Sequence, residues 1–390
     1  MIDIHEARRR IMAAVRPMPF APLALDLAQD HHLAADALAR DAHPRFDMSA
    51  VDGYAVAGDG PTWTLKGALA AGEVHAASLQ PGECVRIFTG AQVPGGADRI
   101  VMQERTAQAD GRVRLSDSVP AVGANIRRRG EQFTEGELLL RQGERLDAPA
   151  IGLLASAGLE EVEASFKPWV SVVRTGGEFI EQGGDRTGRI HSSNEWMLFA
   201  ALHKELCEVE EQGAFIARDD DQDIANALQQ AIEADVVITT GGVSVGDHDR
   251  VADVLRSMGA DIRFHGVAQK PGKPMLFALL KGKPVFALPG NPRAVMVLFW
   301  EYVLPFLRAM QGDPEPGPRV DRLPLATAVR SKGDRAEFRA VRIAGGLAHP
   351  LGDEGSHMLR SLTTADGLMV LHPGDRELRP GELVDVHLRP

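Results

Sequence analysis

The chain has 390 residues and a formal net charge of −11 at pH 7, and 44% of its residues are hydrophobic. That length allows several domains of roughly 100–200 residues each, and the acidic balance disfavours non-specific binding to nucleic acid or to an anionic membrane. The two cysteines, Cys84 and Cys207, are too few for a disulfide framework or a cysteine-rich zinc site, and they favour a reducing cytoplasm.

The first part of the chain is predicted to mix helices with a β-rich insertion. Hydrophobic periodicity predicts helices over 3–16 and 23–40. From residue 41 to 129, short apolar runs separated by glycine and proline predict a β-rich inserted domain. These runs are Trp63-Thr-Leu, Cys84-Val-Arg-Ile-Phe, Arg99-Ile-Val-Met and Val113-Arg-Leu. Residues 130–166, with a predicted helix over Pro149–Ala157, are expected to pack against 1–40 as one domain built from two segments.

Residues 167–312 are predicted to form a parallel sheet covered by helices, because strands and helices alternate along them. The predicted strands are Trp169–Val173, Phe215–Ala217, Val236–Ile238 and a hairpin of Met275–Leu279 with Val285–Leu288. The predicted helices are Asn194–Leu206, Ile224–Ile232, one starting at Arg250, and Pro292–Met310. The longest apolar stretch, 294–307, is interrupted by Glu301 and Pro305 and is too short to span a bilayer, so a soluble protein is expected.

A linker at 312–318 precedes a last domain, 318–390. Its final residues alternate between apolar and polar from Glu382 to Leu388, which is typical of a half-buried strand. We therefore expect a small separate β domain at the end of the chain.

The segment 234–249 carries the most informative chemistry. A buried strand stops at Thr239–Gly242, and a helix is predicted from Arg250. A strand, a glycine loop and a helix in this order present backbone N–H groups and a helix N-terminus to a phosphate. Asp247 and Asp249 lie in the same loop and would repel a phosphate unless a hard divalent cation lay between them. The loop thus predicts a phosphorylated ligand together with a metal such as Mg²⁺.

Two further loops are predicted at the same edge of the sheet. Arg174-Thr-Gly-Gly-Glu178 and Ala217-Arg-Asp-Asp-Asp221 each follow a predicted parallel strand. The carboxyl ends of such strands form the crevice in which ligands bind. For these two loops alone, ordinary turns made by Gly and Asp are an equally good explanation. The 239–249 loop is longer than the roughly two to six residues that a plain connection needs.

Two proline-containing turns follow. Gln269-Lys-Pro-Gly-Lys-Pro274 places Lys270 and Lys273 on a stiff turn, which suits a tetrahedral oxyanion, although two ordinary surface lysines are the simpler interpretation in isolation. In Ala287-Leu-Pro-Gly-Asn-Pro292, Asn291 is expected to cap the last helix and Pro292 fits its first position. Free N–H groups at that turn could also hold a ligand.

In the β-rich insertion, local sequence alone indicates only turns and a solvated edge. Asp52 precedes a glycine, Thr89 lies on a turn, and Arg127-Arg-Arg129 is a compact basic run. The histidines show no metal-ligand spacing.

These motifs occur in a characteristic order: Ser49-Ala-Val-Asp-Gly-Tyr-Ala55, Thr89-Gly-Ala-Gln-Val-Pro94, Val101-Met-Gln-Glu104, Asn125-Ile-Arg-Arg-Arg-Gly-Glu131, Gly241-Gly-Val-Ser-Val-Gly246, Lys270-Pro-Gly-Lys-Pro274, Leu288-Pro-Gly-Asn-Pro292 and Gly355-Ser-His357. Together they resemble the molybdopterin molybdenumtransferases, the MoeA family, which includes the E domain of animal gephyrin. The resemblance runs over nearly the whole chain.

The resemblance implies a multidomain fold. Its parts are a Rossmann-like three-layer α/β molybdopterin-binding domain, a β-rich inserted domain, a mixed N-terminal domain in two segments and a small β-barrel-like C-terminal domain. It also implies a homodimer whose cleft joins the α/β domain of one subunit to the β-rich insertion of the other. In the family's reaction, molybdate is inserted into adenylylated molybdopterin, the pyrophosphate link is cleaved with a divalent metal, and AMP leaves. Chaperones of molybdenum enzymes are candidate partners.

The resemblance also assigns site residues. The residues expected to act in the reaction are Glu178, Asp219, Asp249, Lys270 and Lys273, with Asp52 and Thr89 offered across the dimer; Glu178, Asp219 and Asp249 are the expected Mg²⁺ ligands. The residues expected to contact the phosphorylated ligand are Thr175, Gly176, Thr240, Gly241, Gly242, Ser244, Gly246, Pro289, Gly290, Asn291, Arg127, Arg128 and Ser356.

Four residues depart from the family pattern. Gln132 and Gly177 stand where the family commonly has acidic residues, and Arg293 with Ala294 replaces a common Val-Ser pair. Fewer carboxylates weaken a metal site, and Arg293 is expected to add positive charge at a helix start. We therefore expect altered metal affinity or an altered nucleotide partner. Two alternatives remain: a molybdopterin adenylyltransferase, which leaves 1–165 and 318–390 unexplained, and a non-catalytic dimeric scaffold that binds a peptide.

Overall fold

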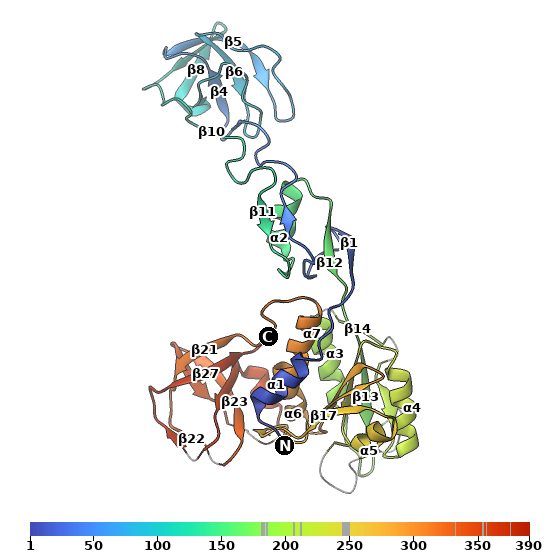
Figure 1. The fold of residues 1–390 in the computed structure, drawn as a ribbon. Helices are drawn as coiled ribbons and strands as arrows, with labels where there is room; N and C mark the ends of the chain where they lie inside the picture. Colours follow the sequence, from blue (N-terminus) through green and yellow to red (C-terminus); the bar gives the residue numbers. More distant parts are fainter. Residues whose placement is uncertain are drawn as a thin grey trace.

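The structure is a computed structural model that describes residues 1–390 except 181–183, 185, 206, 211–212, 244–249, 332, 353–354, 356 and 375. Figure 1 shows an elongated molecule: a β-rich body at one end, a narrow middle segment, and an α/β body beside a second β body at the other end. Within the described residues, no helix combines the length and apolar character needed to cross a membrane.

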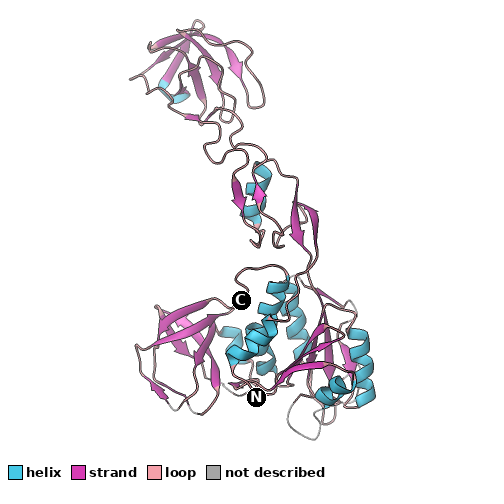
Figure 2. Cartoon of the chain, in the orientation of Figure 1, coloured by secondary structure: helices cyan, strands magenta, loops and turns pink. Residues whose placement is uncertain are grey.

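The β-rich body is a six-stranded sheet with the order β7-β4-β6-β5-β9-β8. Figure 2 shows that it is built almost entirely of strands. Its strands are β4 (Gly53–Val56), β5 (Thr62–Leu69), β6 (Glu83–Ile87), β7 (Arg99–Met102), β8 (Thr106–Ala109) and β9 (Arg112–Leu115), with the short helix η1 (Gln103–Arg105) between β7 and β8. A Cβ at Gly53 would lie 2.1 Å from the carbonyl oxygen of Val101, so glycine is needed where β4 and β7 cross so closely.

The middle segment is formed by chain stretches on both sides of the β-rich body. Short strands pair across it: β1 (Phe20–Ala24) with β12 (Glu161–Ser165), β2 (Ala37–Leu38) with β11 (Leu138–Leu140), and, nearer the β-rich body, β3 (Met48–Ser49) with β10 (Ile126–Arg127). The helix α2 (Ala148–Ser156) starts at Asp147, whose carboxylate accepts a hydrogen bond from the N–H of Ala150.

The helix predicted over 23–40 is wrong. Residues 20–24 form an extended strand, and Asp30 has a φ of 63°, which a right-handed helix does not permit. Leu33 packs instead around Leu154 of α2, so tertiary contacts use the apolar residues in a different conformation. The other predicted N-terminal helix is present as α1 (Ile4–Met12), which the carboxylate of Asp3 caps.

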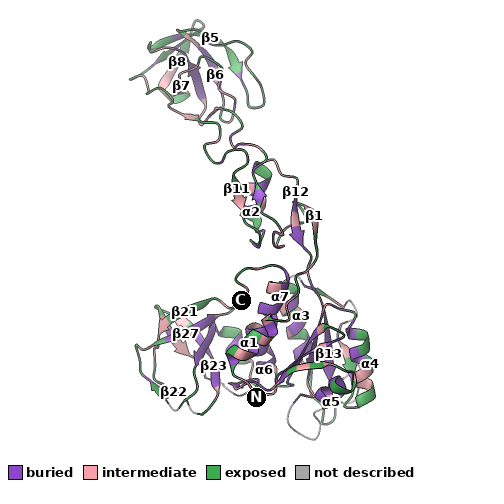
Figure 3. Cartoon of the chain, in the orientation of Figure 1, coloured by how far each residue is buried: buried purple, intermediate pink, exposed green. Residues whose placement is uncertain are grey.

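The α/β body contains a sheet in the order β14-β13-β16-β20-β19-β17, with β15 also paired to β13. It is parallel from β14 to β20, as predicted, and antiparallel between β20, β19 and β17. Its strands are β13 (Trp169–Thr175), β14 (Glu208–Val209), β15 (Phe215–Ala217), β16 (Val236–Thr240), β17 (Asp261–His265), β19 (Leu276–Leu280) and β20 (Lys283–Leu288). Its covering helices are α3 (Asn194–Lys204), α4 (Asp221–Ala231), α5 (Arg250–Ser257) and the long run that follows β20. The central strands β13, β16 and β20 are buried almost throughout, as Figure 3 shows for β13, whereas the edge strand β17 is mostly not.

The predicted helix over 292–310 is one helical run with a wider turn in its middle. It consists of α6 (Pro292–Leu298), the π-helical turn η2 (Phe299–Val303) and α7 (Leu304–Met310). Pro292 occupies the first turn as predicted, whereas the side chain of Asn291 makes no capping hydrogen bond. The expectation that the Asn291 side chain caps this helix is therefore wrong.

The C-terminal β body takes in a strand from the α/β part of the chain. Its larger sheet runs β18-β23-β25-β27-β21, with β24 paired to β23. The elements are β18 (Gln269–Lys270), β21 (Val320–Pro324), β22 (Val329–Ser331), β23 (Ala336–Ala344), β24 (Leu347–Pro350), α8 (Arg360–Thr364), β25 (Gly367–Leu371), β26 (Arg376–Leu378) and β27 (Leu383–Leu388). The parallel pairing of β18 with β23 joins Lys270 to this body.

Candidate active site

A cavity of about 1030 Å³ opens between the α/β body and the C-terminal β body. Three stretches of the α/β body line it, near residues 178–194, 269–274 and 289–294, and the C-terminal body contributes Arg335, Gly355 and His357. A volume of this order suits a cofactor-sized ligand.

The cavity lies beside the point where the strand order of the parallel sheet reverses. From β13, the chain first adds β14 and β15 on one side and then crosses to add β16 on the other. The strands β13, β15 and β16 end at Thr175, Ala217 and Thr240, at the three predicted loops, and β20 ends at Leu288, at the 287–292 turn. This is the edge at which open α/β sheets bind ligands.

Glycines allow these strand ends to approach closely. Gly241 has a φ of 96°, and a Cβ there would lie 2.6 Å from the carbonyl oxygen of Thr175. Gly242 and Gly176 also have positive φ angles, of 62° and 123°. Only glycine combines this backbone with such contacts at little cost.

The two threonines predicted to contact the ligand are buried in this structure, and their hydroxyls bond to backbone carbonyls. Thr175 and Thr240 are each 2% exposed. The hydroxyl of Thr175 donates to the carbonyl of Thr240 at 3.3 Å, and the hydroxyl of Thr240 donates to the carbonyl of Pro289 at 3.4 Å. They hold the strand ends together beneath the cavity, and their contact with a ligand stays a prediction.

Asn194 is a site residue that the sequence analysis treated only as a helix cap. It lines the cavity, is 5% exposed, and its Nδ2 donates to Thr240 Oγ1 and to the carbonyl of Gly290, both at 2.8 Å. Its Oδ1 is buried without a hydrogen-bond partner among the described residues. Asn194 therefore ties the end of β16 to the 289–291 turn.

Two predicted metal ligands lie next to each other at the rim. The Glu178 carboxylate lines the cavity and folds over Gly176, where an added Cβ would meet its Oε2 at 2.3 Å. The N–H of Gly177 donates to Asp219 Oδ2 at 3.2 Å, which brings the Asp219 carboxylate to the same stretch of backbone.

This donor set fits Mg²⁺, which prefers carboxylate oxygens and commonly uses one or two of them together with substrate phosphates. Among the described residues, no three His, Cys, Asp or Glu side chains gather into a metal site. The third predicted ligand, Asp249, lies outside the described residues, as do the predicted ligand contacts Ser244, Gly246 and Ser356.

The lining of the cavity also contains basic residues. Lys270 and Lys273 line it, as do Arg335 and His357 of the C-terminal body. The sequence analysis did not assign Arg335 or His357 to the site, because the β18–β23 pairing that joins the lysine turn to the C-terminal body links segments far apart in the sequence. Three cationic side chains around one polar hollow, in a chain of net charge −11, make this cavity a candidate anion site.

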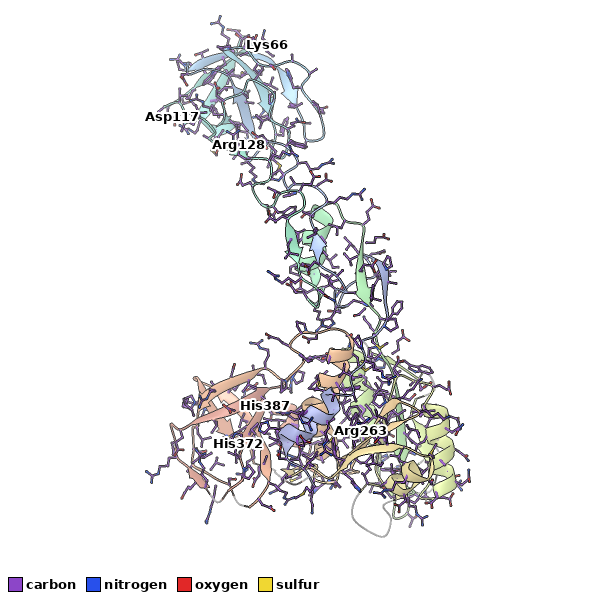
Figure 4. All side chains as sticks on the ribbon, in the orientation of Figure 1. Lys66, Asp117, Arg128, Arg263, His372 and His387 are labelled. Carbon is purple, nitrogen blue, oxygen red and sulfur yellow. The ribbon has the colours of Figure 1, made fainter. Side chains whose placement is uncertain are left out.

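The site residues predicted in the β-rich body lie on a different part of the molecule. The N–H and hydroxyl of Thr89 donate to Asp52 Oδ1 at 2.8 and 2.7 Å. The backbone bond is the main reason that the pKa of Asp52 is lowered. Arg128 pairs with Asp47 at 2.5 Å, and Figure 4 shows Arg128 on the β-rich body, well away from the α/β body. Arg127 belongs to β10 nearby.

One departure from the family pattern has a different consequence from the one expected. Arg293 is 1% exposed, and its guanidinium donates to Ser361 Oγ of α8 at 2.5 Å. The expectation that Arg293 offers its charge to a ligand at the helix start is therefore wrong. The guanidinium of Arg293 instead connects the 292–310 helical run to the C-terminal body.

The fold and the cavity define a multidomain protein whose α/β domain lines a cofactor-sized cavity with cationic and carboxylate side chains. Family models match in the same order: the MoeA N-terminal region (domain I and II) at 2–158, a probable molybdopterin binding domain at 171–309, and the MoeA C-terminal region (domain IV) at 322–388. The chain belongs to the MoeA family, as predicted from its motifs.

Its relatives match along their whole lengths. Proteins named molybdopterin molybdenumtransferase from Staphylococcus aureus and Haemophilus influenzae are each 32% identical, over 99% of this chain and 95% and 98% of theirs. The molybdopterin biosynthesis MoeA protein from Pyrococcus horikoshii is 26% identical with a TM-score of 0.83, and the alignment covers 100% of both chains. The predicted fold class is confirmed, and the predicted enzyme class, a transferase of molybdenum cofactor biosynthesis, is that of these relatives.

Proposed function

We propose that this protein is a molybdopterin molybdenumtransferase, which inserts molybdate into adenylylated molybdopterin and releases AMP. The observation that carries the proposal is the cavity, whose lining combines Lys270, Lys273 and Arg335 with Glu178. The N–H of Gly177, the neighbour of Glu178, holds the Asp219 carboxylate nearby. Cationic side chains together with carboxylates suit a molybdate oxyanion beside a phosphorylated ligand that needs a cation.

Each group has a proposed role. Lys270 and Lys273, with Arg335, bind the oxyanion and orient it. Glu178, Asp219 and Asp249 would hold Mg²⁺, which when bound would neutralise charge on the departing phosphate. Gly242, with Gly290 and Asn291 of the 289–291 turn, would offer backbone N–H groups to the phosphates, whereas the N–H of Gly241 donates to the carbonyl of Leu288. Asn194 keeps these two elements together.

The β-rich body takes part through a second copy of the chain. We propose that a homodimer brings Asp52, Thr89, Arg127 and Arg128 to the cavity of the partner, because the β-rich end of the chain, where Figure 4 labels Arg128, lies far from the α/β body of the same chain. We also propose a cytoplasmic location, chaperones of molybdenum enzymes as further partners, and domains at 1–40 with 130–166, 41–129, 167–312 and 318–390.

AMP release from adenylylated molybdopterin tests this function, measured with and without molybdate and over a range of Mg²⁺. The wild type should release AMP in a molybdate-dependent reaction, and Glu178→Gln should need more Mg²⁺. Adenylyl transfer from ATP to molybdopterin without molybdate would instead identify an adenylyltransferase. Binding of the substrate without turnover would identify a scaffold.

A further inference from the structure

The turn that carries Lys270 and Lys273 is held from its buried side. Both lysines are exposed at the cavity, whereas Pro271 and Gly272 are buried. Gly272 has a φ of 95°, and a Cβ there would lie 2.8 Å from the Leu298 side chain. Lysine ammonium groups sit on flexible four-carbon stems, so the spacing of the two charges depends on how firmly the backbone beneath them is fixed.

Gln269 fixes that backbone with its side chain. It is 0% exposed, and its Nε2 donates to the carbonyl oxygen of Pro271 at 2.8 Å. Its Oε1 accepts a hydrogen bond from the hydroxyl of Tyr302. The carbonyl of Pro271 can only accept, so a reversed amide would set two oxygens against each other. The contacts therefore permit one amide orientation, in which the Tyr302 hydroxyl donates.

Tyr302 is suited to supply that hydrogen bond under all ordinary conditions. It is 1% exposed, and burial raises the pKa of its hydroxyl, so the proton stays in place. Without this donor, Oε1 of Gln269 would be a buried acceptor with no partner, which costs free energy and permits the amide to turn.

The helical turn that bears Tyr302 connects three parts of the molecule. The neighbouring residue, Glu301, is 1% exposed and contacts both Arg8 of α1 and His387 Nδ1 of β27, the latter at 2.8 Å. Figure 4 shows His387 in the C-terminal β body. This is the π-helical turn η2, and such turns inside α-helices are frequent at functional sites. It therefore anchors α1, the C-terminal body and, through Tyr302, the lysine turn.

The backbone of Gln269 also belongs to the C-terminal sheet. In the β18–β23 pairing, Gln269 lies opposite Ala336 and Lys270 opposite Glu337, directly after Arg335. The side chain of Gln269 thus holds the lysine turn, while its backbone holds the strand that starts beside Arg335. Gln269 therefore links the turn that bears both lysines to the strand that begins directly after Arg335.

We propose that Tyr302 and Gln269 are positioning residues that fix Lys270 and Lys273 for binding of a tetrahedral oxyanion. This inference rests on the proposed function, in which the lysines bind molybdate. Tyr302 acts through Gln269, and Gln269 acts through the turn that it closes.

The first test is Tyr302→Phe, which removes only the hydroxyl. Loss of one buried hydrogen bond and disorder of the amide should raise the KM for molybdate about tenfold. The kcat at saturating molybdate and the KM for adenylylated molybdopterin should stay within about twofold of wild type, because the rest of the cavity is untouched. A general loss of structure would change all three parameters.

The chain offers a matched control in its other tyrosine. The hydroxyl of Tyr54 donates to Gln108 Oε1 at 3.0 Å in the β-rich body, so Tyr54→Phe breaks the same kind of bond far from the lysines. Both variants should unfold at a lower temperature than wild type. Only Tyr302→Phe should shift the KM for molybdate, and an equal shift in both variants would overturn the proposal.

A double-mutant cycle tests whether the two residues act as one link. Gln269→Met removes the amide at similar volume and should raise the KM for molybdate at least as much as Tyr302→Phe. The double variant should be no worse than Gln269→Met alone, because both changes break one linkage. Effects that multiply would show two independent roles and contradict the proposal.

The experiments distinguish failure of the proposed function from failure of the positioning role of Tyr302 and Gln269. A wild-type protein with no molybdate-dependent AMP release would count against that function alone. Equilibrium dialysis with molybdate alone then tests the positioning role without turnover. Binding about tenfold weaker in Tyr302→Phe than in Tyr54→Phe would support the role, and equal binding would refute it.

Discussion

Restoring the missing carboxylate at position 177 should strengthen divalent metal binding. Gly177 lacks the positive φ that only glycine tolerates, and a Cβ built on it meets no atom within 4 Å. Gly177→Asp should therefore fold normally. The N–H of this residue already donates to Asp219 Oδ2 at 3.2 Å, so the new side chain would lie close to that carboxylate.

Coulomb's law gives the size of the effect. Two unit charges about 4 Å apart attract by about 1 kcal/mol in water, and a divalent ion doubles this to about 2 kcal/mol. Salt screening and the ordering of an exposed side chain reduce the gain to about 1 kcal/mol. This corresponds to a Kd for Mg²⁺ that is about fivefold lower.

The assay is a titration of AMP release with Mg²⁺, supported by direct binding of Mn²⁺ as a spectroscopic substitute. Gly177→Asn is the matched control, because it adds a side chain of the same shape without the charge. The half-saturating Mg²⁺ concentration should fall in Gly177→Asp and stay near wild type in Gly177→Asn. If the two variants behave alike, the proposed metal position beside Glu178 and Asp219 is wrong.

Three other substitutions test separate parts of the site. Asn194→Ala loses two buried hydrogen bonds and should lower the free energy of unfolding, measured in denaturant, by about 2–3 kcal/mol. The rate of AMP release should also fall strongly. A decrease in the free energy of unfolding of less than about 0.5 kcal/mol would argue against the linking role of Asn194. Gly241→Ala forces a Cβ against a carbonyl oxygen in a left-handed backbone and should cost about 2–4 kcal/mol by the same measurement. Thr89→Val removes the hydroxyl bond to Asp52 but keeps the N–H bond that contributes most, so the pKa of Asp52 should rise only part of the way towards its ordinary value of 3.8, followed by NMR titration. The pKa of Asp52 is lower in the folded protein, so the stabilisation that Thr89 gives should be present above about pH 4 and be lost as the pH falls through that lowered pKa. An Asp52 pKa that is the same in Thr89→Val and wild type would contradict the hydrogen-bond geometry.

Much of the α/β body could be predicted, because each of its strands and helices is indicated by the hydrophobic and glycine pattern of neighbouring residues. The run Val236–Thr240 is apolar, ends at two glycines and precedes a helix, so strand, loop and helix each follow from neighbouring residues. The position of the three loops at one edge follows from parallel pairing alone. The family motifs added the order of the domains, which the pattern does not contain.

Contacts between distant segments could not be predicted. Nothing near Arg335 indicates that β23 pairs with β18 and brings it to the cavity that Lys270 and Lys273 line. Arg293 stands at a helix start, where local rules indicate an exposed charge, yet Ser361 of another body receives it. Residues 23–40 have helical spacing, but packing around α2 selects strands and turns instead. In each case the deciding partner lies far away in the sequence.

Isothermal titration of molybdate into wild type and Lys270→Gln most directly tests whether the cationic side chains of the cavity bind the oxyanion. Removing one charge-assisted contact of roughly 1.5–3 kcal/mol should weaken binding by about ten- to a hundredfold, while unfolding is unchanged because Lys270 is exposed. Molybdate affinity that is the same in both proteins would contradict the assignment of this cavity to the substrate.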